Sequence, residues 1–190
     1  MFVLETKTER LVAALLAVLM AATRVHHFGI GSIAPDASTA VFFLAGLLLA
    51  SPLWFVLFSV LAVGLDAFAL GIAGVADACM TPGYWLLFAG YLALWFAGRL
   101  GRRIERLDVM QGFRLLLLAV GGTAVFFVLS NVGYYFGGGF DESMGAAEYI
   151  RRVQVYFPHY LTVTLAYAAA GVAVFAVATR FLAGGRMAAR

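Results

Sequence analysis

Apolar residues fill six long stretches of the chain, and short segments containing polar residues, glycine or proline separate these stretches. A helix that crosses a lipid bilayer needs about 20 mostly apolar residues. The pattern therefore predicts an all-α integral membrane protein with a six-transmembrane-helix bundle. We place the spans at about 8–27, 36–50, 52–70, 82–98, 112–131 and 158–182.

Capping residues and proline mark the starts of two of these helices. Asp36 comes just before the second helix and can cap it. Thr81 and Pro82 form a start signal for the fourth helix, because a hydroxyl can cap a helix and proline is tolerated at its first position. These signals support the predicted division of the chain into helices.

A short additional helix is predicted through Tyr149–Val155, between the fifth and sixth spans. Asp141 can cap this helix, and Glu148 and Arg152 have the i,i+4 spacing of a helical ion pair. We expect this helix to lie along the outer surface of the bundle.

The composition supports a membrane location. Hydrophobic residues make up 64% of the chain and charged residues 12%, whereas ordinary soluble domains are roughly 45–50% apolar and about 25% charged. A soluble domain of 190 residues could not bury so much apolar surface. We therefore expect one integral membrane domain that comprises residues 1–190.

The basic residues predict the orientation of the bundle, because cytoplasmic connections are enriched in Lys and Arg. With a cytoplasmic N-terminus, the inner side holds Lys7, Arg10, Arg99, Arg102, Arg103, Arg106, Arg114, Arg180, Arg186 and Arg190, and the outer side holds Arg24, Arg151 and Arg152. Both termini are therefore predicted to be cytoplasmic. The net charge of +3 then reflects this orientation, and no nucleic-acid partner is expected.

The outer connections are long and chemically varied, and we therefore expect function at the outer face. Cys79, the only cysteine of the chain, lies in one of them. From its position alone, a lone cysteine of this kind is as often an inert apolar residue as a functional one. A functional thiol is favoured by the nearby start of the fourth helix, whose partial positive charge stabilises thiolate. Thiolate is also a preferred ligand of soft metal centres.

Three histidines lie at the outer ends of predicted spans: His26, His27 and His159. Adjacent helical residues point about 100° apart, so His26 and His27 cannot both bind one ion if that turn is helical. We therefore predict no free metal-ion site. Hydrogen bonds to backbone or lipid headgroups are the simpler interpretation, and contact of one histidine with a bound ligand is the alternative.

Asp66 is the only acidic residue well inside a predicted span. An intramembrane carboxylate usually faces a cavity or a partner, and a structural hydrogen bond to a neighbouring helix is an equally good interpretation. Asn131 lies at the matching depth of the fifth span. Together with Arg24, Cys79 and His159, these residues fall toward the outer mouth of the bundle, which suggests a polar pocket open to the outside. The candidate ligand-binding residues are His27, Asp66, Tyr84, Trp85, Asn131, Tyr134, Tyr135 and His159.

Two further patterns each have two interpretations. Tyr134 and Tyr135 precede three consecutive glycines, and they are either interfacial belt residues or part of a lid over a bulky ligand. Ala13, Ala17 and Ala21 recur every four residues in the first span. This alanine ridge allows close approach of another helix, either within the bundle or from a partner protein.

The length, the six predicted spans, the cytoplasmic termini and the alanine ridge resemble the substrate-binding (S) components of energy-coupling-factor (ECF) vitamin transporters. The sequence Ala-Asp-Ala-Cys-Met-Thr-Pro around Cys79 is similar to the cobalamin-specific S-components of proteobacteria, the BtuM family. The resemblance implies that the Cys79 thiolate ligates the cobalt of cobalamin. It also implies that Ala13, Ala17 and Ala21 dock on the coupling subunit.

The resemblance implies a vitamin transporter of the bacterial inner membrane, surrounded by membrane lipid, and not an enzyme. Thiolate ligation could nevertheless assist removal of the upper axial ligand of cobalamin. No nucleotide-binding loop is recognisable, so an ECF energising module, with a coupling subunit and ATPases, would supply energy for active transport. An S-component for another vitamin or cofactor precursor is the first alternative, and a membrane thiol enzyme is the second.

Overall fold

The computed structural model describes residues 6–24, 34–73, 82–104, 108–137 and 144–188, and these residues form helices and connections without β-strands. The α-helices are α1 (Thr6–Arg24), α2 (Ser38–Leu48), α3 (Leu53–Ala73), α4 (Trp85–Gly101), α5 (Val109–Phe136), α6 (Ala146–Val153) and α7 (Phe157–Ala188). Two 3-10 turns, η3 (Pro82–Tyr84) and η4 (Gln154–Tyr156), precede α4 and α7.

A helix occupies each of the six predicted stretches, so the all-helical architecture is confirmed. Among the described residues, three stretches are long and apolar enough to cross a membrane, namely Leu53–Gly71, Val109–Phe136 and Ala146–Thr179. These properties are consistent with a helical membrane protein. The number of spans and the location of the termini stay predictions.

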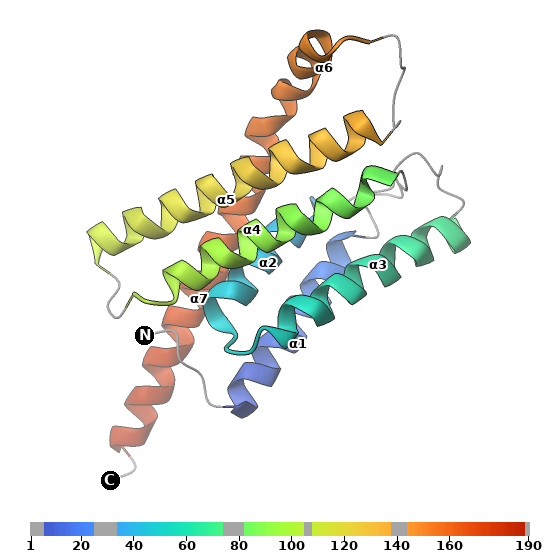
Figure 1. The fold of residues 1–190 in the computed structure, drawn as a ribbon. Helices are drawn as coiled ribbons and strands as arrows, with labels where there is room; N and C mark the ends of the chain where they lie inside the picture. The colour runs from blue at the N-terminus through green and yellow to red at the C-terminus, as the bar shows by residue number, and fades with distance from the viewer. Residues whose placement is uncertain (1–5, 25–33, 74–81, 105–107, 138–143, 189–190) are drawn as a thin grey trace.

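The helices place particular chain segments at two opposite ends of the bundle (Figure 1). One end contains the start of α1, the turn between α2 and α3, and the ends of α4 and α7. The other contains the end of α1, the start of α4, the end of α5, and α6. We call these the inner end and the outer end, following the orientation that the basic residues predict.

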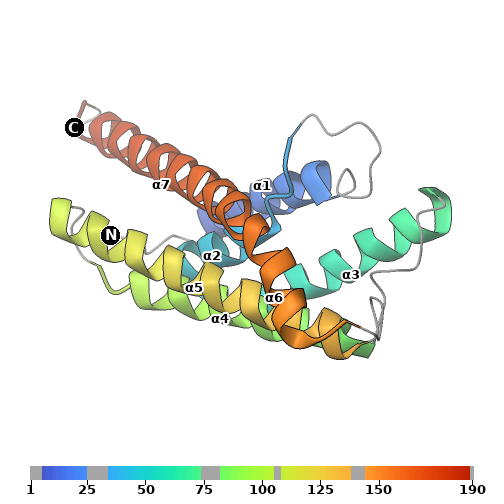
Figure 2. The same cartoon turned by 90° about the horizontal axis from the view of Figure 1, so that it is seen from above.

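α2 forms the centre of the bundle. All eleven of its residues are buried, because α4 packs against one side and α1 and α7 against others. Figure 2 shows α2 between the pair α4 and α5 and the pair α1 and α7. A helix that is apolar on every face is stable in such a central position.

Glycines bring the backbones of α2, α4 and α5 into direct contact. A Cβ atom on Gly46 of α2 would lie 2.0 Å from the carbonyl oxygen of Trp95, and one on Gly98 of α4 would lie 2.0 Å from that of Phe43. A Cβ atom on Gly133 of α5 would be 2.4 Å from a carbonyl oxygen of η3. Small residues that permit such approach are typical of packed membrane helices.

α3 has a different environment, because its outer half diverges from α4 (Figure 2). Large apolar side chains along α3 are exposed, including Leu53 (58%), Val60 (64%) and Phe68 (51%). In a bilayer these side chains would contact lipid. α3 is therefore held less closely by protein than α2.

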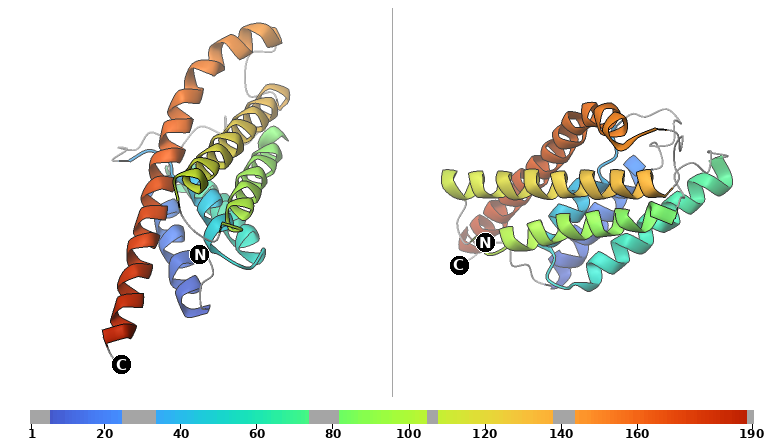
Figure 3. Two further views of the ribbon diagram at one scale, coloured as in Figure 1. Left: turned by 90° about the vertical axis from the view of Figure 1, so that its left-hand side faces the viewer. Right: turned by 45° about the horizontal axis from the view of Figure 1, so that its top comes forward.

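The predicted short surface helix is present as α6 and η4, and the chain bends between α6 and α7 (Figure 3). The i,i+4 ion pair is confirmed, with Arg152 Nε 2.7 Å from a carboxylate oxygen of Glu148. The N-cap of α6 is Gly145, without a side-chain cap. Asp141, the predicted cap, lies outside the described residues.

Candidate functional site

A buried ion pair joins α1 to α3 at the outer end. Arg24, the last residue of α1, donates from Nε to Oδ1 of Asp66 and from Nη2 to Oδ2, both at 2.7 Å. The side chains are 6% and 5% exposed. A bidentate pair gives each charge a partner, which a charge in an apolar surrounding requires.

Residues of α2 and α4 accept hydrogen bonds from Nη1, the third guanidinium nitrogen of Arg24. Its Nη1 donates to the hydroxyl oxygens of Ser38 at 2.9 Å and Tyr91 at 2.7 Å. The Asp36 carboxylate lies 3.7 Å from the same nitrogen, and it also accepts from the N–H and the hydroxyl of Ser38. Arg24 therefore links α1 to three other helices.

Tyr84 completes this group from η3. Its hydroxyl donates to Oδ2 of Asp66 at 2.5 Å, and the ring is half-buried. We call the group the outer polar network; its members are Arg24, Asp36, Ser38, Asp66, Tyr84 and Tyr91. The network connects the ends of α1 and α3 to the starts of α2 and α4.

Aromatic packing positions the Tyr91 hydroxyl within the network. The Tyr91 ring stacks on Phe42 of α2 at a centroid distance of 4.1 Å and on Phe126 of α5 at 5.1 Å. Tyr91 is 2% exposed, so its orientation is fixed by these neighbours. Packing in the core thus fixes the position of the Tyr91 hydroxyl, which accepts a hydrogen bond from Arg24.

The geometry of the network favours a structural role for Asp66. Its carboxylate accepts two hydrogen bonds from Arg24 and one from Tyr84. The sequence permits two interpretations of Asp66, either a carboxylate that faces a cavity or a partner, or a structural hydrogen-bond acceptor. The contacts agree with the second interpretation. Tyr84, another candidate ligand-binding residue, belongs to the same network.

The sequence-based prediction places Arg24 and Asp66 together at the outer mouth of the bundle, but it does not predict that they form an ion pair. A signal for it exists, because α1 and α3 run in the same direction and both residues lie near the outer ends. Equal depth in neighbouring helices makes an ion pair the expected arrangement for two buried charges. Tyr91 carries no comparable signal, since its position depends on packing.

A second group of candidate residues fastens α6 to the end of α5. The Asn131 amide donates to the carbonyl oxygen of Phe127 at 2.8 Å, and its side-chain oxygen accepts from the Tyr149 hydroxyl at 3.0 Å. The Tyr135 ring lies 5.0 Å from the Tyr149 ring. The Tyr135 hydroxyl donates to the carbonyl oxygen of Met144 at 3.4 Å.

The other candidates are exposed, half-buried or outside the described residues. Trp85 is 73% exposed at the start of α4, His159 is exposed near the start of α7, and Tyr134 is half-buried on α5. His27 and Cys79 lie outside the described residues. The structure therefore brings Asp66 together with Tyr84, and it places Asn131 and Tyr135 each in contact with Tyr149.

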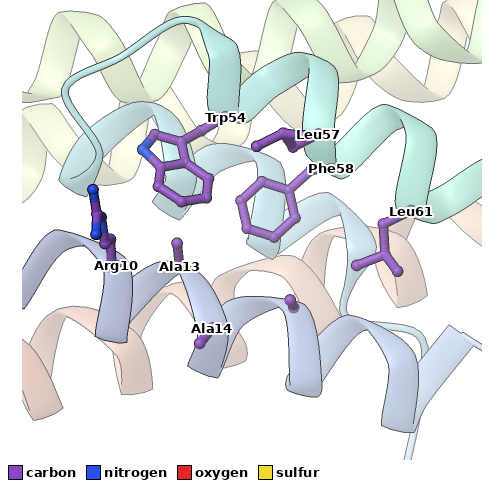
Figure 4. A pocket seen from close by; sticks show the side chains of 8 residues that line it. Arg10, Ala13, Ala14, Trp54, Leu57, Phe58 and Leu61 are labelled. Carbon is purple, nitrogen blue, oxygen red and sulfur yellow. The ribbon is translucent and has the colours of Figure 1, made fainter.

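The alanine ridge of α1 lies partly against α3. Ala13 is 2% exposed, and Ala17 and Ala21 are half-buried. Ala13 and Ala17 line a groove between the two helices with a volume of about 210 Å³ (Figure 4). Its other lining residues are Arg10, Ala14, Trp54, Leu57, Phe58 and Leu61.

Polar contacts also fasten the turn between α2 and α3 at the inner end. The Glu9 carboxylate accepts from the Ala50 N–H at 2.7 Å and from Nε1 of Trp54 at 2.9 Å. Arg99 of α4 donates to the carbonyl oxygens of Ala50 at 2.6 Å and Leu49 at 3.1 Å. α1 and α4 thus hold this turn from two sides.

Within the described ranges, no group of three His, Cys, Asp or Glu side chains is placed to hold a metal ion. No protein-family model matches the chain, and no curated protein matches it in sequence.

Proposed function

We propose that this chain is a membrane vitamin transporter of the ECF S-component type. It binds cobalamin at the extracytoplasmic face and mediates its uptake across the bacterial inner membrane. One observation supports this proposal most directly: the described residues on both sides of the Cys79 segment are tied to the outer polar network. Asp66 lies about two turns before the end of α3, which precedes this segment. Tyr84 is the last residue of η3, which follows the segment, and its hydroxyl donates to Asp66.

The proposed binding step is a ligand exchange at the cobalt of cobalamin. The Cys79 thiolate donates an electron pair to cobalt, and the ligand that occupied this position leaves with its own electron pair. No electron is gained or lost by the metal in this exchange. Thiolate suits a polarisable metal centre, and the bond adds a directional term to the broad van der Waals contact of a large ligand.

Aromatic side chains at the outer end support binding of a bulky, partly apolar ligand. The exposed rings of Trp85 and Phe136 lie there, at the start of α4 and the end of α5. Aromatic rings provide large contact areas to flat ligands. The contacts between α5 and α6 hold Tyr135 and Tyr149 in the same part of the molecule.

Energy for transport would come from a partner, since the sequence contains no recognisable nucleotide-binding loop. We propose an ECF energising module in this role, with the ridge of Ala13, Ala17 and Ala21 as its docking surface. Ala17 and Ala21 are partly accessible on α1, which supports this assignment. Both termini would then be cytoplasmic.

The test is the absorption spectrum of aquocobalamin added to the purified protein. Thiolate ligation shifts the cobalt-dependent bands, and Cys79→Ala abolishes the shift and weakens binding by roughly tenfold or more, about 1.4 kcal/mol. Met80→Leu is the matched control, because it removes the neighbouring sulfur and retains the thiol. This control variant keeps the wild-type spectrum.

Two results would contradict different parts of the proposal. An unchanged spectrum and affinity in Cys79→Ala would exclude thiolate ligation while leaving cobalamin as the substrate. Absence of cobalamin binding by the folded wild-type protein would exclude the substrate itself. Uptake by a cobalamin-dependent host that lacks its own transporter then tests transport separately from binding.

A further inference from the structure

The groove between α1 and α3 lies between two polar contacts that join these helices. The Arg24–Asp66 pair joins the helices at the outer end, and the Glu9–Trp54 hydrogen bond joins them at the inner end. Between these contacts, small alanine side chains on α1 face larger side chains on α3 (Figure 4). The helices are therefore connected but do not fill the space between them.

The lining chemistry of the groove disfavours water as its occupant. Among the described lining residues, Arg10 is the only charged one, and Ala14, Leu57, Phe58 and Leu61 are apolar. Apolar side chains offer ordered water few hydrogen-bond partners, so the groove favours an apolar occupant over water.

The shape of the groove suits a hydrocarbon chain. Its lining on α1 extends from Arg10 to Ala17, which corresponds to about 10 Å along a helix. The lining on α3, from Trp54 to Leu61, has the same length. Leu57 is 46% exposed and Ala14 is exposed, so the groove is accessible from the surrounding lipid.

Arg10 places a positive charge at the inner end of the groove. Its side chain is exposed at the inner end, and within the described part of the chain it makes no ion pair. The neighbouring carboxylate of Glu9 is occupied by Ala50 and Trp54. A guanidinium group binds phosphate oxygens through paired hydrogen bonds.

We propose that the α1–α3 groove is a binding site for an anionic phospholipid. One acyl chain lies between Ala13, Ala14 and Ala17 of α1 and Trp54, Leu57 and Leu61 of α3. The headgroup phosphate contacts Arg10 at the inner membrane surface. This site is separate from the proposed cobalamin site and does not depend on it. It shares Ala13 and Ala17 with the proposed docking ridge, so the lipid and the energising module would exclude each other at these residues.

Trp54 lines the groove and can report directly on its occupant. The chain has three tryptophans, so Trp85→Phe with Trp95→Phe leaves Trp54 as the sole fluorophore. This protein is reconstituted in bilayers that contain increasing fractions of a lipid with a brominated acyl chain. Brominated phosphatidylglycerol and brominated phosphatidylcholine are compared, because they differ in net headgroup charge.

The expected result is half-maximal quenching of Trp54 at about fivefold lower fraction of phosphatidylglycerol than of phosphatidylcholine. This preference corresponds to about 1 kcal/mol for one basic residue near an anionic lipid. Arg10→Gln removes the preference, and Arg10→Lys retains much of it. Lys7→Gln is the matched control, because Lys7 lies on the same helix but does not line the groove.

Ala14→Leu provides an independent test of the acyl-chain position. The larger side chain fills the groove and reduces quenching by both brominated lipids, and it should leave the fold intact because Ala14 is exposed. Equal quenching by the two lipids, or an unchanged preference in Arg10→Gln, would overturn the headgroup assignment. Absence of quenching by either lipid would overturn the site and indicate that a protein segment fills the groove.

Discussion

The bundle contains two helix contacts that are built on different principles. α2 and α4 touch through their backbones along the glycines Gly46 and Gly98. α1 and α3 are joined mainly by side chains at their two ends, through Arg24 with Asp66 and through Glu9 with Trp54. A groove remains between α1 and α3, whereas no space for a Cβ atom remains between α2 and α4.

The difference shows two solutions to one physical problem. Lipid tails are as apolar as leucine, so burial from water does not drive two helices together inside a bilayer. Close backbone contact supplies van der Waals attraction along the helix, and it fixes the distance between α2 and α4. Polar contacts instead act at single points, and they leave the space between α1 and α3 available to another molecule.

The largest effect is expected from breaking the ion pair at the outer end. Asp66→Ala leaves Arg24 buried without its main partner, which typically costs about 3–5 kcal/mol. The measurement is the free energy of unfolding in mixed detergent micelles titrated with sodium dodecyl sulfate. The double variant Arg24→Met with Asp66→Leu carries no unpaired charge and should regain most of the stability. If Asp66→Ala were as stable as the wild type, the structural role of the Arg24–Asp66 pair would be contradicted.

The next effect concerns the glycine contact. Gly98→Ala places a Cβ atom 2.0 Å from the carbonyl oxygen of Phe43, so α2 and α4 must separate, at about 3 kcal/mol. Gly64→Ala on α3 is the matched control, because nothing lies within 4 Å of the added atom. Alanine also favours a helix over glycine by about 1 kcal/mol. The same unfolding titration should therefore give opposite signs for the two substitutions.

A smaller effect is expected at Tyr84. Tyr84→Phe removes one hydrogen bond to Asp66 and leaves the Arg24 pair intact, so we expect a loss of about 1 kcal/mol. Trp85→Phe changes the adjacent, 73% exposed ring and serves as the control. Equal stabilities of the two variants would show that the Tyr84 hydrogen bond contributes nothing to the network.

The smallest effect is expected at the inner end. Glu9→Ala removes the acceptor for Ala50 and Trp54 at a partly exposed position, and a loss of about 0.5–1 kcal/mol follows. The indole environment of Trp54 also changes, which its emission wavelength reports. Lys7→Ala is the control on the same face of the membrane. If Glu9→Ala lowered the free energy of unfolding as much as Asp66→Ala does, the polar contacts at the inner and outer ends would contribute equally to stability.

The helices were predictable from the sequence because apolar stretches and proline positions determine them locally. α3 begins and ends close to the predicted positions, whereas α5 extends beyond its predicted range at both ends. The Glu148–Arg152 pair follows from spacing alone. The glycine contacts were not predicted, although each glycine is visible in the sequence. A glycine is useful to packing only where another backbone faces it, and this depends on the arrangement in space.

The outer polar network was predictable only in part. Asp66 and Tyr84 are among the candidate residues, and Arg24 is predicted to lie near Asp66 at the outer mouth, but the ion pair between Arg24 and Asp66 is not predicted. Tyr91 depends on stacking between Phe42 and Phe126, which no local pattern encodes. The role predicted for Cys79 stays a prediction.

The central helix α2 has a consequence for how the protein is made. Its eleven residues correspond to about 16 Å, about half of the ~30 Å of hydrocarbon that a span must cross. The helices that cover it most, α4 and α7, are synthesised after it. Of the three helices α1, α4 and α7, only α1 precedes α2 in the chain. We therefore expect α2 to be fully covered only after α7, the last helix, has been synthesised.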